Sequence, residues 1–387
     1  MTAAAPSAPA APAPPPRRRW LTPLTRRRLR NFRRNGRAFW SLLIFAVIFG
    51  LSLFAEFLAN DRPILVSYRG EWRVPVVSFY SEASFGGTYR TEAAYREAPV
   101  QCLIATGGLE DCFYEPEETL AAARAGALDG NPDYSPGWVI WPLIPYHYTT
   151  IVDRPGAAPL PPGGDNYLGT DDTKRDVLAR VIYGVRLSVL FALIVTAATS
   201  VLGVVAGAVQ GFFGGWVDLI FQRLIEIWAG IPSLYVIIIL FAIIGRSFWL
   251  LVALTILFGW TALVGVVRAE FLRARNFEYV RAARALGVSN TVLMFRHLLP
   301  NAMVATLTML PFLVTGAIGT LAGLDFLGYG LPSSAPSLGE LSMQAKQNLQ
   351  APWLGLTSFF VFAILLALLV FIFEGIRDAF DPRKTFS

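Results

Sequence analysis

Residues 17–59 read RRRWLTPLTRRRLRNFRRNGRAFWSLLIFAVIFGLSLFAEFLA, a basic stretch that changes abruptly into an apolar one. Ten arginines and no acidic residue lie within residues 17–37, and the apolar run extends from Ala38 to near Ala59. A run of about twenty apolar residues can cross a bilayer, whereas the apolar core of a signal peptide is shorter. Because arginines beside a span stay in the cytoplasm, the stretch predicts a retained first transmembrane helix with its N-terminus inside, rather than a cleaved signal peptide.

The composition of the whole chain also indicates a membrane protein. Of its 387 residues, 54% are hydrophobic and only 16% are charged, which is too apolar for a water-soluble protein of this length. The net charge of +6 does not indicate a nucleic-acid partner, because the basic residues flank apolar runs instead of alternating with stacking aromatic residues. Two cysteines and two histidines are too few for a Cys/His metal site. The composition therefore predicts an all-α polytopic membrane protein that binds no metal.

Five further apolar segments follow the first, which gives six predicted transmembrane helices. They cover residues 186–210, 217–244, 247–268, 299–328 and 352–375. Counting crossings from a cytoplasmic N-terminus puts the connection between the fourth and fifth helices, and the C-terminus, in the cytoplasm.

The basic residues outside the tail follow this topology. The predicted cytoplasmic parts carry Arg273, Arg275, Arg281, Arg284, Arg296, Arg383 and Lys384. The predicted outside connections carry little beyond Arg246 and Lys346. This asymmetry predicts a multi-pass membrane protein with both termini in the cytoplasm.

The predicted spans divide the chain into four parts. Residues 1–37 form an arginine-rich cytoplasmic tail, predicted to be disordered because its beginning consists almost entirely of Ala, Pro and Ser. Residues 38–59 form the first transmembrane helix. Residues 60–183 form an insertion with seventeen acidic and ten basic residues, the reverse of the tail, so it is predicted to lie outside the cytoplasm. Residues 184–387 form a five-helix core with a distinctive cytoplasmic segment at residues 278–301.

The insertion has mixed signals that do not name a fold. Residues 64–80 are rich in Val, Tyr, Trp and Phe with Gly70 in the middle, which predicts a hairpin of strands. Cys102 and Cys112 both lie in this insertion, where an oxidising compartment permits a disulfide. The sequence leaves open whether they are bridged or are two free thiols, because it does not fix the distance between their Cα atoms.

Two of the predicted spans contain glycine or proline residues, which can interrupt a helix or leave part of its surface without side chains. Pro232 follows closely after Gly230 in the third span, and the fifth span carries Gly316, Gly319 and Gly323. Such residues can line a path through the membrane. Small residues at these spacings equally allow helices to pack closely, so the sequence leaves both interpretations open.

Residues 278–301, EYVRAARALGVSNTVLMFRHLLPN, predict two helices separated by a bend. On the first helix, apolar residues recur at i, i+3, i+4 and i+7, and the stripe consists of Tyr279, Ala282, Ala283 and Leu286. Its two adjacent alanines leave room for another protein to approach. Gly287 is expected to end this helix and Ser289 to cap the next. The apolar face of the second helix is expected to be Val292, Phe295 and Leu299.

This segment resembles the coupling motif of ATP-binding-cassette (ABC) importer permeases. In that motif two alanines, a glycine four residues beyond the second and a Leu-Pro pair mark the helix that docks into a cleft of the ATPase subunit. The matching positions are Ala282, Ala283, Gly287, Leu299 and Pro300. The glutamate that often precedes the alanines is replaced by Arg281, as in the peptide-importer branch, so a salt bridge through that acid is not expected. Together with Tyr279 and Leu286, these residues are the predicted ATPase-coupling site.

Three further stretches resemble the dipeptide and oligopeptide permeases. They are YLGTDDTKRDVLARVIYGVRL (residues 167–187), LDFLGYGLPSSAPSLGELSMQA (residues 324–345) and GIRDAFDPR (residues 375–383). In the first, Thr170 is expected to cap a helix whose first turn holds Asp171 and Asp172. The long insertion resembles the subgroup that serves microcin C and related oligopeptides, the YejE type. The resemblance implies the fold of type I importer permeases and a location in a bacterial inner membrane.

The resemblance also implies what the chain does and with which partners. It implies a permease subunit that imports oligopeptides or peptide-like compounds, has no catalytic residue and binds no cofactor. ATP and magnesium are expected in two ABC ATPase domains or subunits. The other implied partners are a second permease that completes a heterodimer, a periplasmic substrate-binding protein, the peptide substrate and membrane lipid, with no nucleic acid.

Two other classes of protein are the alternatives. The three lysines, Lys174, Lys346 and Lys384, do not follow a glycine, so the chain lacks the Gly-Lys-Ser/Thr loop of an ATPase of that class. An intramembrane enzyme could use His147 or His297 as a base, but neither has an evident nucleophile partner in the sequence. An ion-coupled carrier usually has charged groups at mid-membrane, and the central portions of these six spans are almost free of charge.

Overall fold

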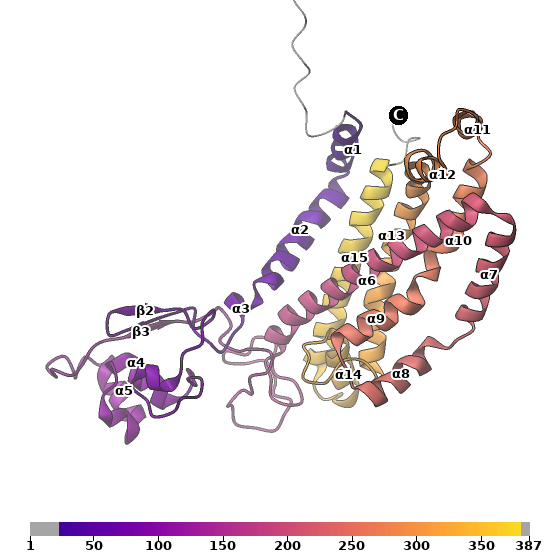
Figure 1. The fold of residues 1–387 in the computed structure, drawn as a ribbon. Coiled ribbons are helices and arrows are strands. Elements are labelled where there is room, and N and C mark those ends of the chain that lie inside the picture. The colour runs from indigo at the N-terminus through magenta and orange to yellow at the C-terminus, as the bar shows by residue number, and fades with distance from the viewer. Residues whose placement is uncertain (1–22, 381–387) are drawn as a thin grey trace, which may run out of the picture.

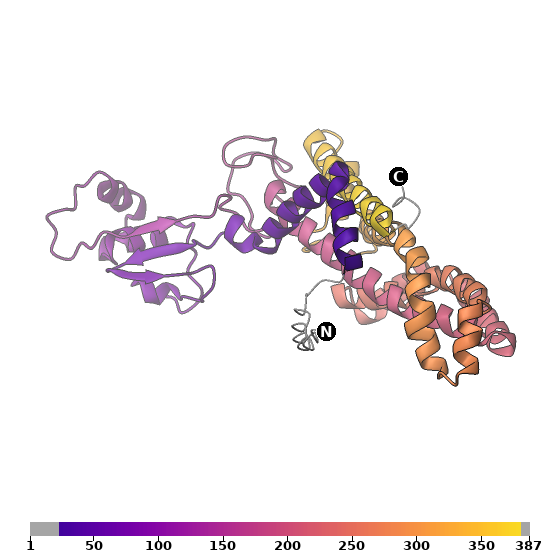
Figure 2. The same ribbon diagram turned by 90° about the horizontal axis from the view of Figure 1, so that it is seen from above.

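The computed structural model describes residues 23–380 and consists of a bundle of long helices with an elongated insertion at one end (Figures 1 and 2). Residues 1–22, which hold most of the predicted disordered tail, and residues 381–387 lie outside the described part. Within the described part, five helical segments are long and apolar enough to cross a membrane, and a bent helix pair makes a sixth when it is counted as one span. This confirms the predicted polytopic helical fold.

Eight helices make up the membrane part of the described chain. They are α2 (Gly36–Leu53), α6 (Val177–Phe213), α7 (Gly215–Ala229), α8 (Ser233–Ile244), α9 (Phe248–Gly259), α10 (Thr261–Ala274), α13 (Leu299–Phe326) and α15 (Pro352–Phe380). Helices α9 and α10 together form one span, and α13 continues a span that begins with α12 (Asn290–Val292) and a π-helical turn, η3 (Leu293–Leu298). The 37 residues of α6 extend over about 55 Å, so this helix projects beyond the bilayer.

The chain begins, in its described part, with helix α1 (Pro23–Arg34). The prediction that the disordered tail continues to residue 37 was wrong here. Phe32 is buried in a small cluster with Ala379 of α15, and the guanidinium carbon of Arg28 lies 4.2 Å from the ring centroid of Phe380. An apolar contact and a cation–π contact with the far end of the chain therefore order this helix.

Glycines bring α6 into close contact with α10. Gly203, Gly207 and Gly211 recur every four residues along α6. A Cβ atom added at any of them would lie within 2.7 Å of a backbone carbonyl oxygen of residues 260–268. Only glycine permits this approach, so the small-residue packing common in membrane helices is used on the second span.

The glycines of the fifth span behave differently. A Cβ atom added at Gly316, Gly319 or Gly323 of α13 would meet no atom within 4 Å. Close packing inside this chain, one of the two interpretations that the sequence left open, therefore does not explain them. They leave one face of α13 open.

The third span is broken where the sequence predicted. Helices α7 and α8 meet at an angle of 64° across Gly230 and Pro232. Proline cannot donate a backbone hydrogen bond and clashes with the preceding turn, which explains the bend. No residue of α7 is buried, and its Trp216 and Ile227 are 79% and 71% exposed. Helix α7 therefore leaves apolar side chains uncovered, whereas α8 buries Ile237 and Phe241 in the main core.

The insertion contains a small antiparallel sheet in the order β2-β1-β3. Strands β1 (Leu65–Tyr68) and β2 (Glu71–Arg73) form the predicted hairpin, and β3 (Trp138–Ile140) pairs with the other edge of β1. The turn residues Arg69 and Gly70 both have positive φ, as a two-residue hairpin turn requires. Helix α3 (Ala55–Leu58) leads from α2 into the insertion. Four short helices complete the insertion, namely η1 (Glu82–Phe85), α4 (Ala98–Thr106), η2 (Glu110–Phe113) and α5 (Pro116–Arg124).

A disulfide joins Cys102 of α4 to Cys112 of η2, with their Cα atoms 5.6 Å apart. The sequence had left this pairing open. Both cysteines are fully buried and pack with Leu103 and Leu109 in an apolar cluster of the insertion. The bridge stabilises this part chiefly by restricting the unfolded chain.

Candidate functional site

The predicted coupling segment begins with helix α11 (Glu278–Ala285), and it ends at the glycine that the sequence indicated. The backbone N–H of Val288 donates to the carbonyl oxygen of Ala283 over 3.1 Å. Gly287 has a φ of +80°, in the left-handed region, and a Cβ atom there would meet nothing within 4 Å. Glycine is therefore required at this position by backbone conformation and not by lack of space.

Helix α11 is attached to the bundle through one fully buried side chain, Val280. Its apolar cluster draws on the ends of several helices and contains Ala208, Phe212, Val267, Phe271, Ala274, Leu293, Met294, Leu298 and Ala302. Of the predicted stripe, Ala283 packs against this cluster, whereas Ala282 is exposed and Tyr279 and Leu286 are 42% and 85% exposed. The helix thus presents most of its predicted stripe outward, where another protein can contact it.

The second predicted helix is the beginning of the fifth span, because α12, η3 and α13 continue one another without a break. Ser289 occupies the capping position, although its side chain makes no capping hydrogen bond. The predicted apolar face was wrong for Val292 and Phe295, which are 39% and 57% exposed. The π-helical turn shifts the helical register, so that Leu293, Met294 and Leu298 are buried instead.

The Leu-Pro pair of the motif lies in the first turn of α13. Leu299 is half-buried against the cluster that holds Val280, and Pro300 is exposed. Proline is tolerated inside this continuous span because the Leu-Pro pair directly follows the π-helical turn, and local π-helical adjustments satisfy the backbone groups that a proline frees.

Neighbouring side chains support α11 from below. The guanidinium carbon of Arg284 lies 5.4 Å from the ring centroid of Phe212 at the end of α6. The amide of Asn301 in α13 donates a 3.0 Å hydrogen bond to the hydroxyl of Tyr279. Arg281 is exposed and has no acidic partner within residues 23–380. The outward surface of α11 is therefore apolar and positively charged.

An ion pair beside this segment was not predicted from the sequence. Arg268 of α10 donates to both carboxylate oxygens of Asp218 in α7, over 2.5 and 2.6 Å. Bidentate pairs of this kind are the stronger and more directional ones. Opposite charges at the same predicted end of two spans were the available signal, because a charge near a span needs a partner.

At the opposite end of the bundle, the predicted helix cap was wrong. Helix α6 starts at Val177, and the side chain of Asp176 caps it by accepting a 2.7 Å hydrogen bond from the N–H of Ala179. Thr170 instead accepts a hydrogen bond from the N–H of Leu160. The capping residue is therefore Asp176, the carboxylate nearest the apolar run.

Asp171 forms an ion-pair cluster in place of the predicted helix-end role. It is fully buried, as is its partner Arg180, and it also accepts from Nε of Arg175 over 2.8 Å. Burial alone raises the pKa of Asp171, but the charges of Arg180 and Arg175 outweigh it and hold this pKa below its usual value. The carboxylate is therefore ionised at neutral pH.

This cluster fastens two of the family-like stretches together. Arg175 donates to the carbonyl oxygen of Ser333 over 3.0 Å, and Arg180 donates to that of Ala335 over 3.1 Å. Both carbonyls lie in the connection between α13 and α14 (Leu338–Gln347). The indole of Trp353 in α15 donates to the carbonyl oxygen of Thr170 over 3.2 Å. We call this set of contacts the end clamp.

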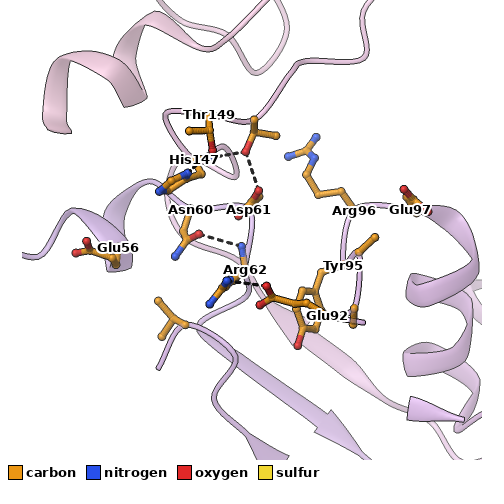
Figure 3. Close-up of a pocket in the computed structure, with 14 residues that line it drawn as sticks. Glu56, Asn60, Asp61, Arg62, Glu92, Tyr95, Arg96, Glu97, His147 and Thr149 are labelled. Atoms are coloured by element: carbon orange, nitrogen blue, oxygen red, sulfur yellow. Dashed lines mark hydrogen bonds and ion pairs between the residues drawn. The ribbon is translucent and has the colours of Figure 1, made fainter. Parts of the chain in front are cut away.

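A polar cavity of about 580 Å³ lies where the insertion joins α3 (Figure 3). Its charged lining residues are Glu56, Asp61, Arg62, Glu92, Arg96 and Glu97. Arg62 pairs with Glu92 over 2.7 Å, and the hydroxyl of Thr150 donates to Asp61 over 2.8 Å. The cavity lies at the end of the molecule opposite α11 (Figure 1).

The alternative of an intramembrane enzyme requires His147 or His297 to act as a catalytic base. Nδ1 of His147 lies 2.7 Å from the hydroxyl oxygen of Thr149, two residues away in the same turn, and burial lowers the pKa of His147. No carboxylate is bonded to this ring in the described chain, so the third member of a nucleophilic triad is missing. His297 lies on η3. No group of three or more His, Cys, Asp or Glu side chains in residues 23–380 is placed to hold a metal.

Comparison with known proteins identifies relatives of both the core and the insertion. The family model described as "Binding-protein-dependent transport system inner membrane component" matches residues 180–386, which include the whole coupling segment. The peptidoglycan transport system permease protein YejE of Agrobacterium fabrum is 50% identical over 396 residues, which cover 96% of each chain. The inner membrane ABC transporter permease protein YejE of Escherichia coli K12 is 51% identical over 94% of this chain and 98% of its own.

A more distant relative covers a smaller part of the chain. The oligopeptide transport system permease protein OppC of Bacillus subtilis is 34% identical over 232 residues, 58% of this chain and 74% of its own length. The two relatives at about half identity therefore extend over the insertion as well, as the resemblance of the long insertion predicted.

Proposed function

This chain belongs to the family of binding-protein-dependent transport system inner membrane components, and we propose that it imports oligopeptides or peptide-like compounds such as microcin C. In this proposal it is the membrane-spanning permease of an ABC importer and does no chemistry itself. ATP and magnesium are bound and used by two partner ATPases. The similarity to peptide permeases over the core supports the cargo class.

The observation that carries this proposal is the arrangement of α11. One buried valine holds the helix to the bundle, while Tyr279, Ala282 and Leu286 face outward. A partner that binds this stripe contacts a helix joined, through the bend at Gly287, to the uninterrupted span of residues 290–326. Closure of the ATPases on ATP would press on α11 and tilt this span. That motion would alternate the opening of the transport path between the two sides of the membrane.

The proposed heterodimer is supported by surfaces that this chain leaves uncovered. No residue of α7 is buried, and the glycine face of α13 meets no atom of this chain. A second permease packed against these helices would enclose the transport path between the two subunits. The coupling segment faces the cytoplasm in this arrangement, and so do both termini. The insertion and its polar cavity then face the periplasm, where a binding protein delivers the peptide.

Reconstitution tests the proposal directly. The full chain would be placed in liposomes with its second permease, two ATPases and a binding protein, and uptake would be measured across a panel of peptides. We expect uptake that requires ATP hydrolysis. Uptake that continues without ATP, driven by an ion gradient, would show an ion-coupled carrier and overturn the proposal.

The bend offers a sharper test. Gly287→Val forces a β-branched residue into a left-handed backbone conformation, which costs about 1–2 kcal/mol and displaces α11. We expect this variant to insert into the membrane normally and to lose most ATP-dependent uptake. Gly287→Asn is the matched control, because asparagine tolerates this conformation, and it should keep most of the uptake. Full uptake in the valine variant would show that the bend is dispensable.

A further inference from the structure

Helix α1 lies across the end of the bundle at which α11 is found. It is seen nearly end-on in Figure 1 and lengthwise in Figure 2, whereas α2 and α15 run along the bundle. Phe32 and Arg28 turn toward α15, where they contact Ala379 and Phe380. These contacts fix which side of α1 faces away from the protein.

The side of α1 that faces away from the bundle is a row of arginines. Arg30 lies four residues after Arg26 and three and four residues before Arg33 and Arg34, so the four share one side of the helix, and all four are exposed. None has an acidic partner in the described chain, and the sequence contains no acidic residue before Glu56. We call this row the arginine face.

We propose that the arginine face binds the anionic headgroups of phospholipids at the membrane surface. A helix lying in the plane of the interface, with basic residues on one side, is the form in which proteins bind anionic lipid surfaces. Guanidinium groups match phosphate oxygens with paired hydrogen bonds. The adjoining helix α2 exposes Trp40, Leu43 and Val47, as expected for a helix in contact with lipid.

A lipid surface fits this face better than the acidic surface of an ATPase does. Helices α1 and α11 lie well apart in both views (Figures 1 and 2), so the arginine face is separate from the proposed ATPase contact. Helix α1 joins the start of α2 through Asn35, and only three residues of α2 are buried. A phospholipid beside α2 therefore brings its headgroup to the level of α1.

Spin-labelled lipids test the proposal on the full chain in phosphatidylcholine vesicles. The probes are spin-labelled phosphatidylglycerol and spin-labelled phosphatidylcholine, and electron paramagnetic resonance measures the fraction of each that the protein immobilises. We expect a preference for phosphatidylglycerol of at least roughly fivefold, the contribution of one basic residue near an anionic surface. High salt should reduce this preference, because exposed charges are screened.

Variants assign the preference to the arginine face. R26Q/R30Q/R33Q/R34Q should abolish it, whereas the same four positions changed to lysine should retain it, because the charge remains. A matched pair compares R30Q/R33Q with R90Q/R124Q, since Arg90 and Arg124 are exposed arginines of the insertion. The first double variant should lower the preference and the second should not.

Three results would overturn the proposal. The glutamine variant could keep the preference for phosphatidylglycerol, or the lysine variant could lose it, which would show that charge is not its cause. The glutamine variant could also bind lipid normally and fail to associate with the ATPases. That outcome would make the arginine face a protein contact.

Discussion

The two ends of the helix bundle are built on opposite principles. At the α11 end, a single buried valine attaches a helix whose remaining apolar residues are largely exposed. At the other end, the end clamp buries Asp171 and Arg180 completely and ties three segments of the chain together. The charged groups of one end are paired within this chain, whereas the other end leaves apolar side chains uncovered, as the proposed docking of a partner requires.

Helix α13 connects these two ends. It begins with Leu299 near α11 and ends at Phe326. In its last turn, Asp325 accepts a 2.6 Å hydrogen bond from the N–H of Leu331 and a further one from the hydroxyl of Ser337. A loosely attached helix at one end and a fixed connection at the other give the span a movable end and a held end. In the proposed mechanism, the ATPases therefore push on the chain where its internal contacts are fewest.

The largest effect is expected from breaking the end clamp. Asp171→Asn leaves the guanidinium of Arg180 buried without its counter-charge, and removing one partner of a buried pair costs about 3–5 kcal/mol. We expect the free energy of unfolding of the full chain in detergent micelles to fall by this amount. Circular dichroism during a denaturant titration measures it.

A second ion pair at the same end serves as the control. Glu56 and Arg186 are joined over 2.8 Å, but their side chains are 42% and 25% exposed. Glu56→Gln should therefore cost less than about 1 kcal/mol. Equal losses in the two variants would mean that burial does not distinguish the pairs, and the contrast between the two ends would lose its basis.

The fold was predictable where the signal was local. The length of the apolar runs predicted the spans. Gly230 and Pro232 predicted the break in the third span, and Gly70 predicted the hairpin turn. Helix α1 was not predictable, because its apolar anchor, Phe32, contacts residues at the other end of the chain. Composition alone favoured disorder there.

The same distinction holds for the candidate site. The end of α11 at Gly287 follows from a backbone conformation that glycine adopts readily. The predicted apolar face of the following helix was wrong, because the π-helical turn at residues 293–298 changes which side chains are buried. The role of Asp171 was also missed, because the first carboxylate after Thr170 looked like a helix-end residue and its partners depend on tertiary packing.

The next largest effect distinguishes Val280, which attaches α11 to the bundle, from Leu286, which is proposed to contact the ATPase. Val280→Ala removes buried methyl groups and leaves a cavity, so the free energy of unfolding should fall by about 2 kcal/mol. Leu286→Ala changes a side chain that is 85% exposed, and its effect on stability should stay within about 0.5 kcal/mol.

Binding of the ATPase subunits should rank the two variants the other way. Truncation of an apolar residue at a protein contact costs more than about 1.4 kcal/mol where it matters, so Leu286→Ala should weaken association roughly tenfold. Titration of purified ATPase against the permease in detergent measures this affinity. If Leu286→Ala destabilises the chain and leaves the affinity unchanged, then α11 packs inside the protein and is not a docking surface.

The smallest effect is the pH dependence of the end clamp, in which two adjacent carboxyl groups act in opposite directions. The charges of Arg180 and Arg175 outweigh burial and lower the pKa of Asp171, whereas burial and the charge of Asp171 raise the pKa of Asp172. A lowered pKa contributes stability above the unfolded value, about pH 4, and this is lost as the pH falls further. A raised pKa acts against stability at neutral pH, and this penalty is relieved as the pH falls toward 4.

Stability measured from pH 7 to pH 3 therefore distinguishes the two groups. Asp172→Asn should be more stable than the wild type at pH 7, and the difference should vanish toward pH 4. Asp171→Asn should be less stable at pH 7, and its deficit should shrink only below pH 4. Asp176 and Glu340 titrate in both variants, and burial, the largest cause of their raised pKa values, is the same in each. Parallel profiles for the two variants would mean that Asp171 is not held ionised by its arginines, and that the clamp depends on its hydrogen bonds alone.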